Sequence, residues 1–468
     1  MSERQAEEEG SGQECFALGT EGDLAARVRS LMGRARSDLE RLVAIPSVAD
    51  PSVYPQEHCL QAAALVRDAF EAVGIAQCEV LPMPDGHPAV HGSAPAPAGA
   101  PTILLYAHYD VQPPMAERQW RSPPFVLTER DGRWYGRGAA DCKGNIVAQL
   151  TALRALQQEG LRVGLKVLVE GAEEQGTGGL ERFIEREREL IAADAVLVCD
   201  SGNVAAGLPT LTVSLRGVVN LTVTVRTLKG AMHSGMFGGP APDALVALVR
   251  MLGTLHDDAG DVSVRGIDAT GRWEGSPYEA QAFIADVGML DGVSLIGSGS
   301  VSDMLWARPA INFLGIDCPS VAGSAAAIQP QARARVSMRL PPGVDLVAAE
   351  QALTAHLKAV APWGAHVEIA HEASGKPFQT SVNGPFFAAM VEAMRASYGA
   401  EVTLAGQGGS IPLCAAFAEV LEGAEVMLLG VEEPQCLIHA PNESVDPAEI
   451  ERTALTIASF LRNAGFMS

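Results

Sequence analysis

The stretch ILLYAHYD, residues 103–110, carries the pattern that decides the predicted fold. Its apolar first half follows Pro101 and is typical of a short strand that is buried on both faces. The polar residues His108 and Asp110 come directly after the apolar run. Because ligands of open α/β sheets bind outside the carboxyl ends of the strands, these two residues indicate a site at that edge.

Three further apolar runs end in acidic residues in the same way, and helical patterns lie between them. The runs are VLVEGAEE (167–174), AVLVCD (195–200) and VMLLGVEE (426–433). Apolar residues at helical spacing predict helices over residues 24–43, 60–73, 145–158, 179–190, 385–398 and 447–464. Strands that alternate with helices predict the fold class α/β, with a mixed, mostly parallel sheet flanked by helices.

The middle of the chain has a different pattern. Residues 221–225 and 333–340 alternate strictly between apolar and polar, as half-exposed strands do, and helices are predicted over 243–255 and 345–360. This indicates an inserted α+β domain of β-α-β-β-α-β (ferredoxin-like) order, with a Gly- and Ser-rich loop at 286–302. We expect a flexible acidic tail over 1–22, a catalytic domain in two parts over 23–215 and 376–468, and the inserted domain over 216–375.

The charge and the cysteines exclude several classes of function. A formal net charge of -22 argues against nucleic acid as a partner, since affinity for a phosphate backbone comes mainly from Lys and Arg. No apolar run reaches the roughly 18 residues of a membrane span, and the acidic N-terminal segment does not resemble a signal peptide, so we expect a cytoplasmic protein without membrane contact. The eight cysteines contain no CxxC pair, which predicts reduced thiols and leaves nitrogen and oxygen atoms as metal ligands.

Acidic and imidazole side chains gather at the predicted strand ends. They are His108, Asp110, Glu173, Glu174 and Asp200, with Asp141 of GRGAADCKG (136–144) before a helix and His439 after the last strand. A single Asp or His after a strand is usually an ordinary loop residue, but a shared metal site explains so many at one edge. Without cations, such a cleft would raise the pKa values of its carboxyl groups strongly, so the pattern predicts divalent metal ions.

Seven motifs occur in an order that resembles one enzyme family. They are HYDVQP, GRGAADCKG, EGAEEQGTGGL, CDSGN, HSGMFGG, GGSIP and IHAPNE, and the similarity extends over residues 24–465. The chain resembles the di-zinc metallopeptidase family that includes carnosinase-like dipeptidases, aminoacylases and succinyl-diaminopimelate desuccinylases. The resemblance implies two Zn²⁺ per subunit, with Mn²⁺ or Co²⁺ as substitutes. His108 and Asp200 would bind one ion. Glu174 and His439 would bind the other, and Asp141 would bridge both.

The resemblance also implies the catalytic residues. Glu173 would be the general base that takes a proton from water activated by two metals, while its neighbour Glu174 binds a metal. Adjacent side chains of an extended segment point in different directions, which fits this division. Asp110 would orient the imidazole of His108. His233 of HSGMFGG would reach the active site of the other subunit in a homodimer and polarise the scissile carbonyl there.

The resemblance implies that two further segments bind the substrate. It also implies that the inserted domain is a lid and dimerisation domain. Arg339 of SMRLPPG resembles an arginine that binds the substrate's terminal carboxylate, for which a planar guanidinium is well shaped. Gly408, Gly409 and Ser410 of GQGGSIP resemble the loop whose backbone holds the same carboxylate. One departure from the family pattern is Ala326, where carnosinase-like relatives have a Thr or Asn that contacts the substrate.

These observations predict a metal-dependent hydrolase that cleaves the peptide bond of dipeptides or short peptides. The nearest alternative is an N-acyl or N-succinyl amino-acid amidohydrolase of the same fold, although the Asp of CDSGN is frequent among the dipeptidases. A catalytically inactive binding protein is an alternative of a different class, but every metal and base position is filled. Cys142 would need a base to act as a nucleophile, and none occurs at a readable spacing, so we expect a packed loop thiol.

Overall fold

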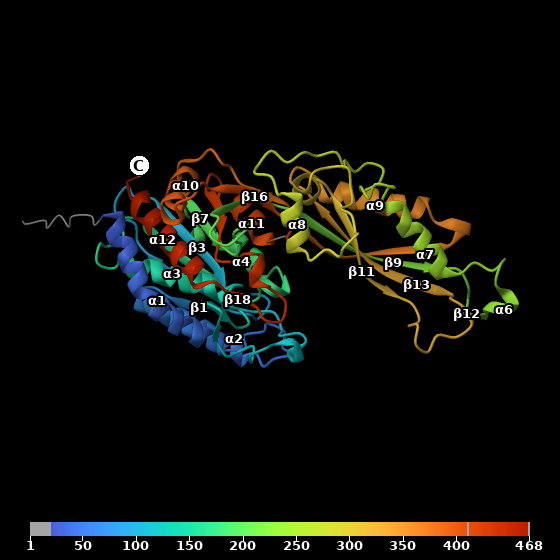
Figure 1. Cartoon of the computed structure of the whole chain (residues 1–468), viewed down its shortest axis with the longest axis horizontal. Coiled ribbons are helices and arrows are strands. Elements are labelled where there is room, and N and C mark those ends of the chain that lie inside the picture. The colour runs from blue at the N-terminus through green and yellow to red at the C-terminus, as the bar shows by residue number, and fades with distance from the viewer. Residues whose placement is uncertain (1–19, 410, 467–468) are drawn as a thin grey trace, which may run out of the picture.

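The computed structural model describes residues 20–409 and 411–466, which form two regions placed end to end in an elongated molecule (Figure 1). The larger region contains α1 (Glu21–Val43) and α12 (Pro447–Ala464), near the two ends of the described chain. Residues 1–19 of the predicted tail lie outside the described residues. The helix α1 begins at Glu21, capped by Thr20, and so starts before the predicted end of the tail at residue 22.

A nine-stranded mixed sheet forms the centre of the larger region. In order across the sheet, its strands are β1 (Glu79–Leu81), β2 (Ala89–Ala94), β6 (Gly164–Glu170), β3 (Thr102–His108), β7 (Ala195–Cys199), β17 (Glu425–Leu429), β8 (Thr210–Leu215) and β15 (Phe378–Gln379), and β16 (Thr403–Gln407) pairs with β8. β3 is parallel to both β6 and β7, and β17 is parallel to β7. The carboxyl ends of these four strands therefore meet at one edge of the sheet.

Helices cover both faces of this sheet because alternate side chains of each buried strand enter opposite cores. Ile103 and Leu105 of β3 pack into one core, whereas Leu104 and Tyr106 pack into the other. The first core also contains side chains of α1, α2 (Glu57–Ala72), α3 (Lys143–Leu156), α10 (Pro385–Tyr398) and α12, and the second those of α4 (Gly179–Arg186), α5 (Arg188–Ile191) and α11 (Pro412–Val420). The predicted α/β class with a mixed sheet is confirmed.

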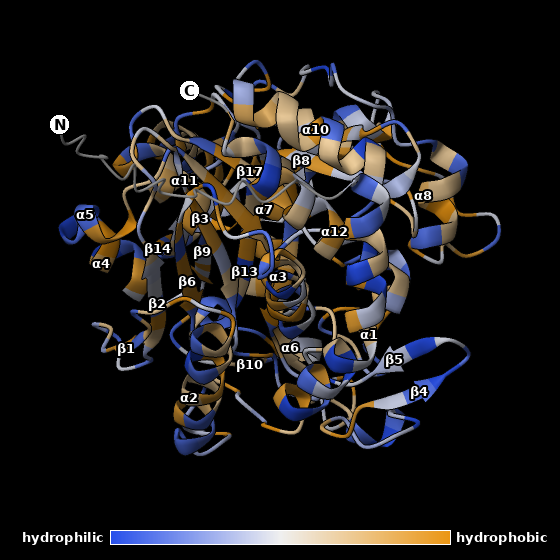
Figure 2. Cartoon of the chain, turned by 90° about the vertical axis from the view of Figure 1, so that its left-hand side faces the viewer, coloured by the Kyte–Doolittle hydropathy of each residue, from blue (hydrophilic) through white to orange (hydrophobic). Residues whose placement is uncertain are grey.

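Hydropathy follows this layering (Figure 2). Hydrophobic residues occupy the central strands, and the outer surfaces of helices such as α1 and α2 carry hydrophilic ones. Among the described helices, none combines the length and the apolar character that crossing a lipid bilayer requires. One predicted helix differs, since the segment 179–190 is divided at Glu187, where the backbone leaves the helical region (φ -105°, ψ 45°).

The smaller region is built on a four-stranded antiparallel sheet. Its order is β11 (Ala310–Asp317), β13 (Gln331–Leu340), β9 (Gly217–Arg226) and β14 (His366–Gly375), and α7 (Ala244–Leu252) and α9 (Leu346–Ala359) pack on one face around a separate hydrophobic core. The chain order β9-α7-β11-β13-α9-β14 is the predicted ferredoxin-like order. The main sheet ends at Leu215 and resumes at Phe378, which is where the chain enters and leaves this region.

The remaining elements are short. A long connection between α7 and β11 contains η3 (Gly253–Leu255), α8 (Ala280–Asp286) and the π-helix η4 (Asp303–Ala307), and the predicted loop at 286–302 lies between the last two. The far end of the smaller region carries β10 (Met232–His233), α6 (Ser234–Phe237) and β12 (Ala327–Ile328) (Figure 1). The larger region also contains a small sheet of β4 (Thr128–Arg130), β5 (Arg133–Tyr135) and β18 (Ser444–Val445). Its short helical turns are η1 (Glu117–Gln119), η2 (Glu173–Gln175) and η6 (Pro434–Cys436). The smaller region contains one further turn, η5 (Pro362–Gly364), among the described residues.

Candidate metal centre and active site

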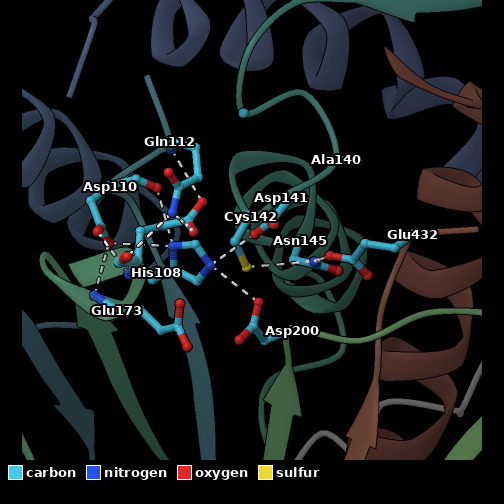
Figure 3. A network of polar contacts seen from close by, with 12 residues as sticks. His108, Asp110, Gln112, Ala140, Asp141, Cys142, Asn145, Glu173, Asp200 and Glu432 are labelled. Atoms are coloured by element: carbon cyan, nitrogen blue, oxygen red, sulfur yellow. Dashed lines mark hydrogen bonds and ion pairs between the residues drawn. The ribbon is translucent and has the colours of Figure 1, made fainter. Parts of the chain in front are cut away.

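The carboxyl edge of the main sheet brings seven predicted site residues together. His108 is the last residue of β3, Asp200 directly follows β7, and Glu173 and Glu174 form the turn η2 just after β6. The others are Asp110, Asp141 and His439. Figure 3 shows His108 with Asp110 on one side of its ring and Asp141 and Asp200 on the other. The parallel strands explain this convergence, since their ends deliver side chains from distant parts of the sequence to one place.

Asp141 contacts two histidines through different oxygen atoms. Its Oδ1 atom lies 3.0 Å from Nε2 of His108, and its Oδ2 atom lies 3.0 Å from Nε2 of His439. Asp200 approaches His108 on the same nitrogen at 3.1 Å, and Glu174 approaches His439 at 3.0 Å. The result is two imidazole and carboxylate groups that share the carboxylate of Asp141.

These donor atoms fit a pair of divalent cations. The ligand atoms of Asp141, Glu174 and His439 all lie within 4.8 Å of one another, and so do those of His108, Cys142 and Asp200. Imidazole nitrogen and carboxylate oxygen suit zinc and similar ions, and a shared carboxylate is typical of sites with two metals. Burial raises the pKa of Asp200 to about 6. Positive charge at this place would offset the cost of burying so many acids.

Cys142 lies in the group with His108 and Asp200, although sequence reasoning did not treat it as a ligand. It is fully buried, and its Sγ donates a hydrogen bond to the carbonyl oxygen of Cys199 at 2.9 Å. Burial raises the pKa of this thiol well above its usual value. A protonated thiol that donates to a carbonyl agrees with the predicted packing role and not with a nucleophile.

Asp110 connects His108 to the turn that carries the two glutamates. Its Oδ1 atom lies 3.3 Å from Nδ1 of His108, and its carboxylate accepts hydrogen bonds from the backbone nitrogens of Glu173 and Glu174 at 3.2 and 3.1 Å. The side chain is fully buried. It therefore fixes the imidazole ring and the acidic turn with respect to each other, which is the geometry expected of a residue that orients a ligand.

The two adjacent glutamates have different surroundings. Gln112 donates to the carboxylate of Glu174 through Nε2 at 2.9 Å and through its backbone nitrogen at 3.2 Å, while His439 contacts the same carboxylate. The Glu173 carboxylate has no hydrogen-bond partner within residues 20–409 and 411–466, and burial raises its pKa well above the usual value, with Asp200 acting in the same direction. These contacts hold the carboxylate of Glu174 in place, whereas no described side chain fixes that of Glu173 by a hydrogen bond.

Glu443 is a site-forming residue that sequence reasoning did not single out. Its carboxylate contacts Nη1 of Arg137 at 2.6 Å and accepts hydrogen bonds from the backbone nitrogens of Gly138, Ala140 and Asp141 at 3.0, 3.1 and 3.2 Å. It is fully buried and lies four positions after His439. Its place at the end of the IHAPNE motif was the only sequence signal, and that motif was interpreted through His439 alone.

The structure separates His233 from the other site residues. His233 is exposed at the β10–α6 junction, at the end of the smaller region farthest from the main sheet (Figure 1). Its Nδ1 atom accepts a hydrogen bond from the backbone nitrogen of Gly235 at 3.1 Å. Ala326 lies beside it, since its carbonyl oxygen accepts from the nitrogen of Ser234 at 2.9 Å. Within one chain, neither residue reaches the metal-binding edge.

Arg339 and Gly408 lie near Arg216, where the two regions meet. Arg339 pairs with Val218 in the small sheet, and Arg216 lies two residues before Val218, between β8 and β9. Arg216 is 7% exposed, and its Nε and Nη1 atoms have no partner among the described residues. Burial, and then the charge of Arg339, lower the pKa of Arg216 to about 10. Sequence reasoning did not identify this second cation.

A pocket of about 380 Å³ adjoins these elements. It is lined by residues near Asp200 and His439, by the 406–408 backbone and by side chains of the connection between α7 and β11. A Cβ added to Gly408 would lie 2.8 Å from Nη2 of Arg216, so the loop approaches this guanidinium closely. Ser410 lies outside the described residues, and Gly409 is open to solvent.

Comparison with known families identifies the class of protein. The model of the family described as Peptidase family M20/M25/M40 matches residues 104–463. The chain belongs to this family. As an M20/M25/M40 peptidase it is a hydrolase of peptide bonds, and the predicted relationship to carnosinase-like enzymes is confirmed.

Its relatives include several dipeptidases. A cysteinylglycine-S-conjugate dipeptidase of Corynebacterium striatum is 44% identical over 371 residues, which are 78% of this chain and 82% of the relative. The Beta-Ala-His dipeptidase of Homo sapiens is 30% identical over 404 residues, which are 82% of this chain and 78% of the relative. The crystal structure of human carnosine dipeptidase 1 matches with a TM-score of 0.79 at 25% identity and covers 96% of this chain and 99% of that chain. The predicted metallodipeptidase class is confirmed, and the N-acyl alternative is not favoured.

Proposed function

We propose that this M20/M25/M40 peptidase is a zinc-dependent dipeptidase whose two metal ions are held by His108, Asp141, Glu174, Asp200 and His439. The observation that carries the proposal is the position of Asp141, whose two oxygens each face a different histidine at 3.0 Å. A carboxylate placed in this way is suited to bridge two cations. Zinc is proposed as the metal because each position combines an imidazole nitrogen with carboxylate oxygens, and the exposed His439 leaves the site open, as in catalytic zinc sites.

Glu173 is the proposed general base. Two divalent cations, when bound, lower the pKa of water and polarise a carbonyl group. Glu173 then takes the proton from the attacking water and passes it to the leaving amine, a task that its unpartnered carboxylate suits. Figure 3 shows this carboxylate and that of Asp200 on the same side of the His108 ring. Asp110 fixes the positions of Glu173 and of the His108 imidazole relative to each other, because it contacts both residues.

Arg339 and the 408–410 loop are proposed to bind the free carboxylate of the dipeptide. Arg216 supports this assignment, because two neighbouring guanidinium groups without a carboxylate partner among the described residues form an anion site. Charge-assisted, bidentate hydrogen bonds are the strong form of such contacts. Gly408, Gly409 and Ser410 would add backbone N–H groups at the same place.

His233 is proposed to act in trans. It lies far from the metal-binding edge of its own chain, so a contribution to the reaction requires a second copy in a homodimer (Figure 1). There it would donate a hydrogen bond to the carbonyl oxygen of the scissile bond. In this arrangement residues 23–215 and 376–468 are the catalytic domain, and residues 216–375 are the lid and dimerisation domain.

The proposed substrates are dipeptides of cysteinylglycine type, including S-conjugates, because the relative that is 44% identical carries that description. We place the enzyme in the cytoplasm. The cysteines at 59, 78, 142, 199, 318, 414 and 436 are all free thiols, which fits a reducing compartment.

A substrate panel with metal analysis tests the proposal. The purified protein is assayed on Cys-Gly, β-Ala-His, N-acetyl-cysteine and N-succinyl-alanine after loading with zinc, manganese or cobalt. The expected result is cleavage of dipeptides with two zinc ions per chain. Cleavage of the acyl compounds alone would overturn the assignment.

A further inference from the structure

Two exposed apolar residues stand directly before His439. Leu437 is 50% exposed and Ile438 is 40% exposed, and both line the pocket of about 380 Å³. Leu437 adopts φ 53° and ψ 43°, in the left-handed region that residues with a Cβ seldom occupy. Backbone strain of this kind is concentrated at ligand-binding sites. The strained conformation holds a large, half-exposed apolar side chain at the pocket.

Aromatic side chains also line the pocket. Tyr278 stacks on Trp306, with ring centroids 5.9 Å apart and an interplanar angle of 18°. Trp306 is fixed against the main sheet, since a Cβ at Gly406 would lie 2.5 Å from its ring. Leu305, beside it, also lines the pocket. A pocket that combines stacked aromatic rings with exposed aliphatic side chains is a surface for an apolar group.

The lining of the pocket combines two kinds of chemistry. Gly408 lies close to the guanidinium of Arg216, whose Nε and Nη1 atoms have no partner among the described residues. Leu437 and Ile438 directly precede His439 in the chain. A dipeptide whose carboxylate lies near Gly408 and whose scissile carbonyl lies near His439 directs the side chain of its amino-terminal residue toward Leu437 and Ile438.

We propose that this pocket selects dipeptides whose amino-terminal side chain is large and apolar, with Leu437, Ile438, Leu305, Tyr278 and Trp306 as the specificity-determining residues. An S-alkyl or S-aryl cysteine has such a side chain, whereas unmodified cysteine leaves the aliphatic and aromatic walls in contact with water. The inference rests on the proposed dipeptidase function and adds the residues that choose among its substrates.

The test compares S-benzyl-Cys-Gly with Cys-Gly as paired substrates of the zinc-loaded, full-length enzyme. The measured quantity is the selectivity ratio, kcat/KM for the benzyl compound divided by kcat/KM for Cys-Gly. Leu437→Asn keeps a residue that tolerates the left-handed conformation and removes the apolar surface, so we expect the ratio to fall about 10-fold. Ile438→Thr, which keeps the branch at Cβ but replaces the ethyl group with a hydroxyl, should lower it in the same direction.

Leu60→Asn is the matched control, because Leu60 on α2 is also 50% exposed but lies outside the pocket. It should leave the ratio unchanged. Equal ratios for wild type, Leu437→Asn and Leu60→Asn, in an enzyme that cleaves both dipeptides, would overturn the specificity inference and leave the dipeptidase intact. A wild-type enzyme that favours Cys-Gly over the benzyl compound would overturn it as well. If zinc-loaded protein cleaves neither dipeptide, the proposed function fails and the inference falls with it.

Discussion

The Oδ2 atom of Asp141 lies 3.0 Å from Nε2 of His439, while the other oxygen of the same carboxylate faces His108. Asp141→Asn replaces one of these oxygens with an NH₂ group, which cannot bind a cation, so we expect metal to be lost at both positions. Elemental analysis of dialysed protein measures this. Asp268→Asn, at an exposed turn, should keep the full metal content. Two ions retained by Asp141→Asn would contradict the shared role.

Glu173→Gln should lower kcat by roughly 10²- to 10⁴-fold and leave the metal content and the fold unchanged, because it removes only the proton acceptor. Steady-state kinetics on a cleaved dipeptide, with elemental analysis of the same sample, provides the measurement. Glu185→Gln, on the exposed side of α4, is the control and should keep wild-type rates. Loss of zinc from the Glu173 variant would show that this residue is a ligand.

Arg339→Ala should raise KM about 10- to 100-fold for dipeptides with a free carboxylate and much less for their amidated forms, because one partner of a charge-assisted hydrogen bond is removed. Arg216→Met should act in the same direction. The control is Arg333→Ala, on the same face of β13, where Arg333 is exposed and already paired with Asp317. If Arg339→Ala raised KM equally for dipeptides with a free carboxylate and for their amidated forms, Arg339 would not bind the carboxylate.

Lys143→Met should lower the free energy of unfolding by about 2–4 kcal/mol, since two buried carbonyl groups lose their donor. The Nζ atom of Lys143 donates to the carbonyl oxygens of Leu42 and Ile45 at 2.9 and 2.8 Å, at the carboxyl end of α1. Urea unfolding of the two proteins measures the difference. Lys358→Met, at an exposed position of α9, should change stability by less than about 0.5 kcal/mol. Equal stability of both variants would contradict the proposed role of these bonds.

His233→Ala and Glu173→Gln should each be nearly inactive as homodimers and complement each other when mixed. A mixed dimer contains one site with an intact Glu173 from one chain and an intact His233 from the other. Random reassortment makes about half of the dimers mixed, each with one repaired site, so about a quarter of wild-type activity should return. Mixing verified by native mass spectrometry without recovered activity would show that His233 does not act across an interface.

The sequence predicted the parts of the fold in which a local pattern and the tertiary environment agree. β3, β6, β7 and β17 are buried on both faces, so each appeared as a continuous apolar run, and the polar residues after them could be recognised as site residues. The ferredoxin-like order followed from alternation in β9 and β13. By contrast, α8 (Ala280–Asp286) has no buried residue, so no apolar stripe marked it.

Residues that act through distant partners could not be found in this way. The role of Arg216 depends on Arg339 and on Gly408, and that of Gln112 on the carboxylate of Glu174. These contacts join segments that are remote in the sequence, so the local sequence pattern does not predict them. The break in the predicted helix 179–190 has the same origin, because propensity alone does not locate the turn at Glu187.

The contact between Glu443 and the backbone of residues 138–141 also determines the order in which the centre can form. The segment that carries Asp141 leaves the ribosome long before the segment that carries His439 and Glu443, and the whole of the smaller region is synthesised in between. Until Glu443 emerges, the nascent chain has neither the acceptor that shapes this loop nor one of the two histidines that face Asp141. In the proposed ligand set, the position of Glu174 and His439 is therefore completed only after the smaller region has been synthesised.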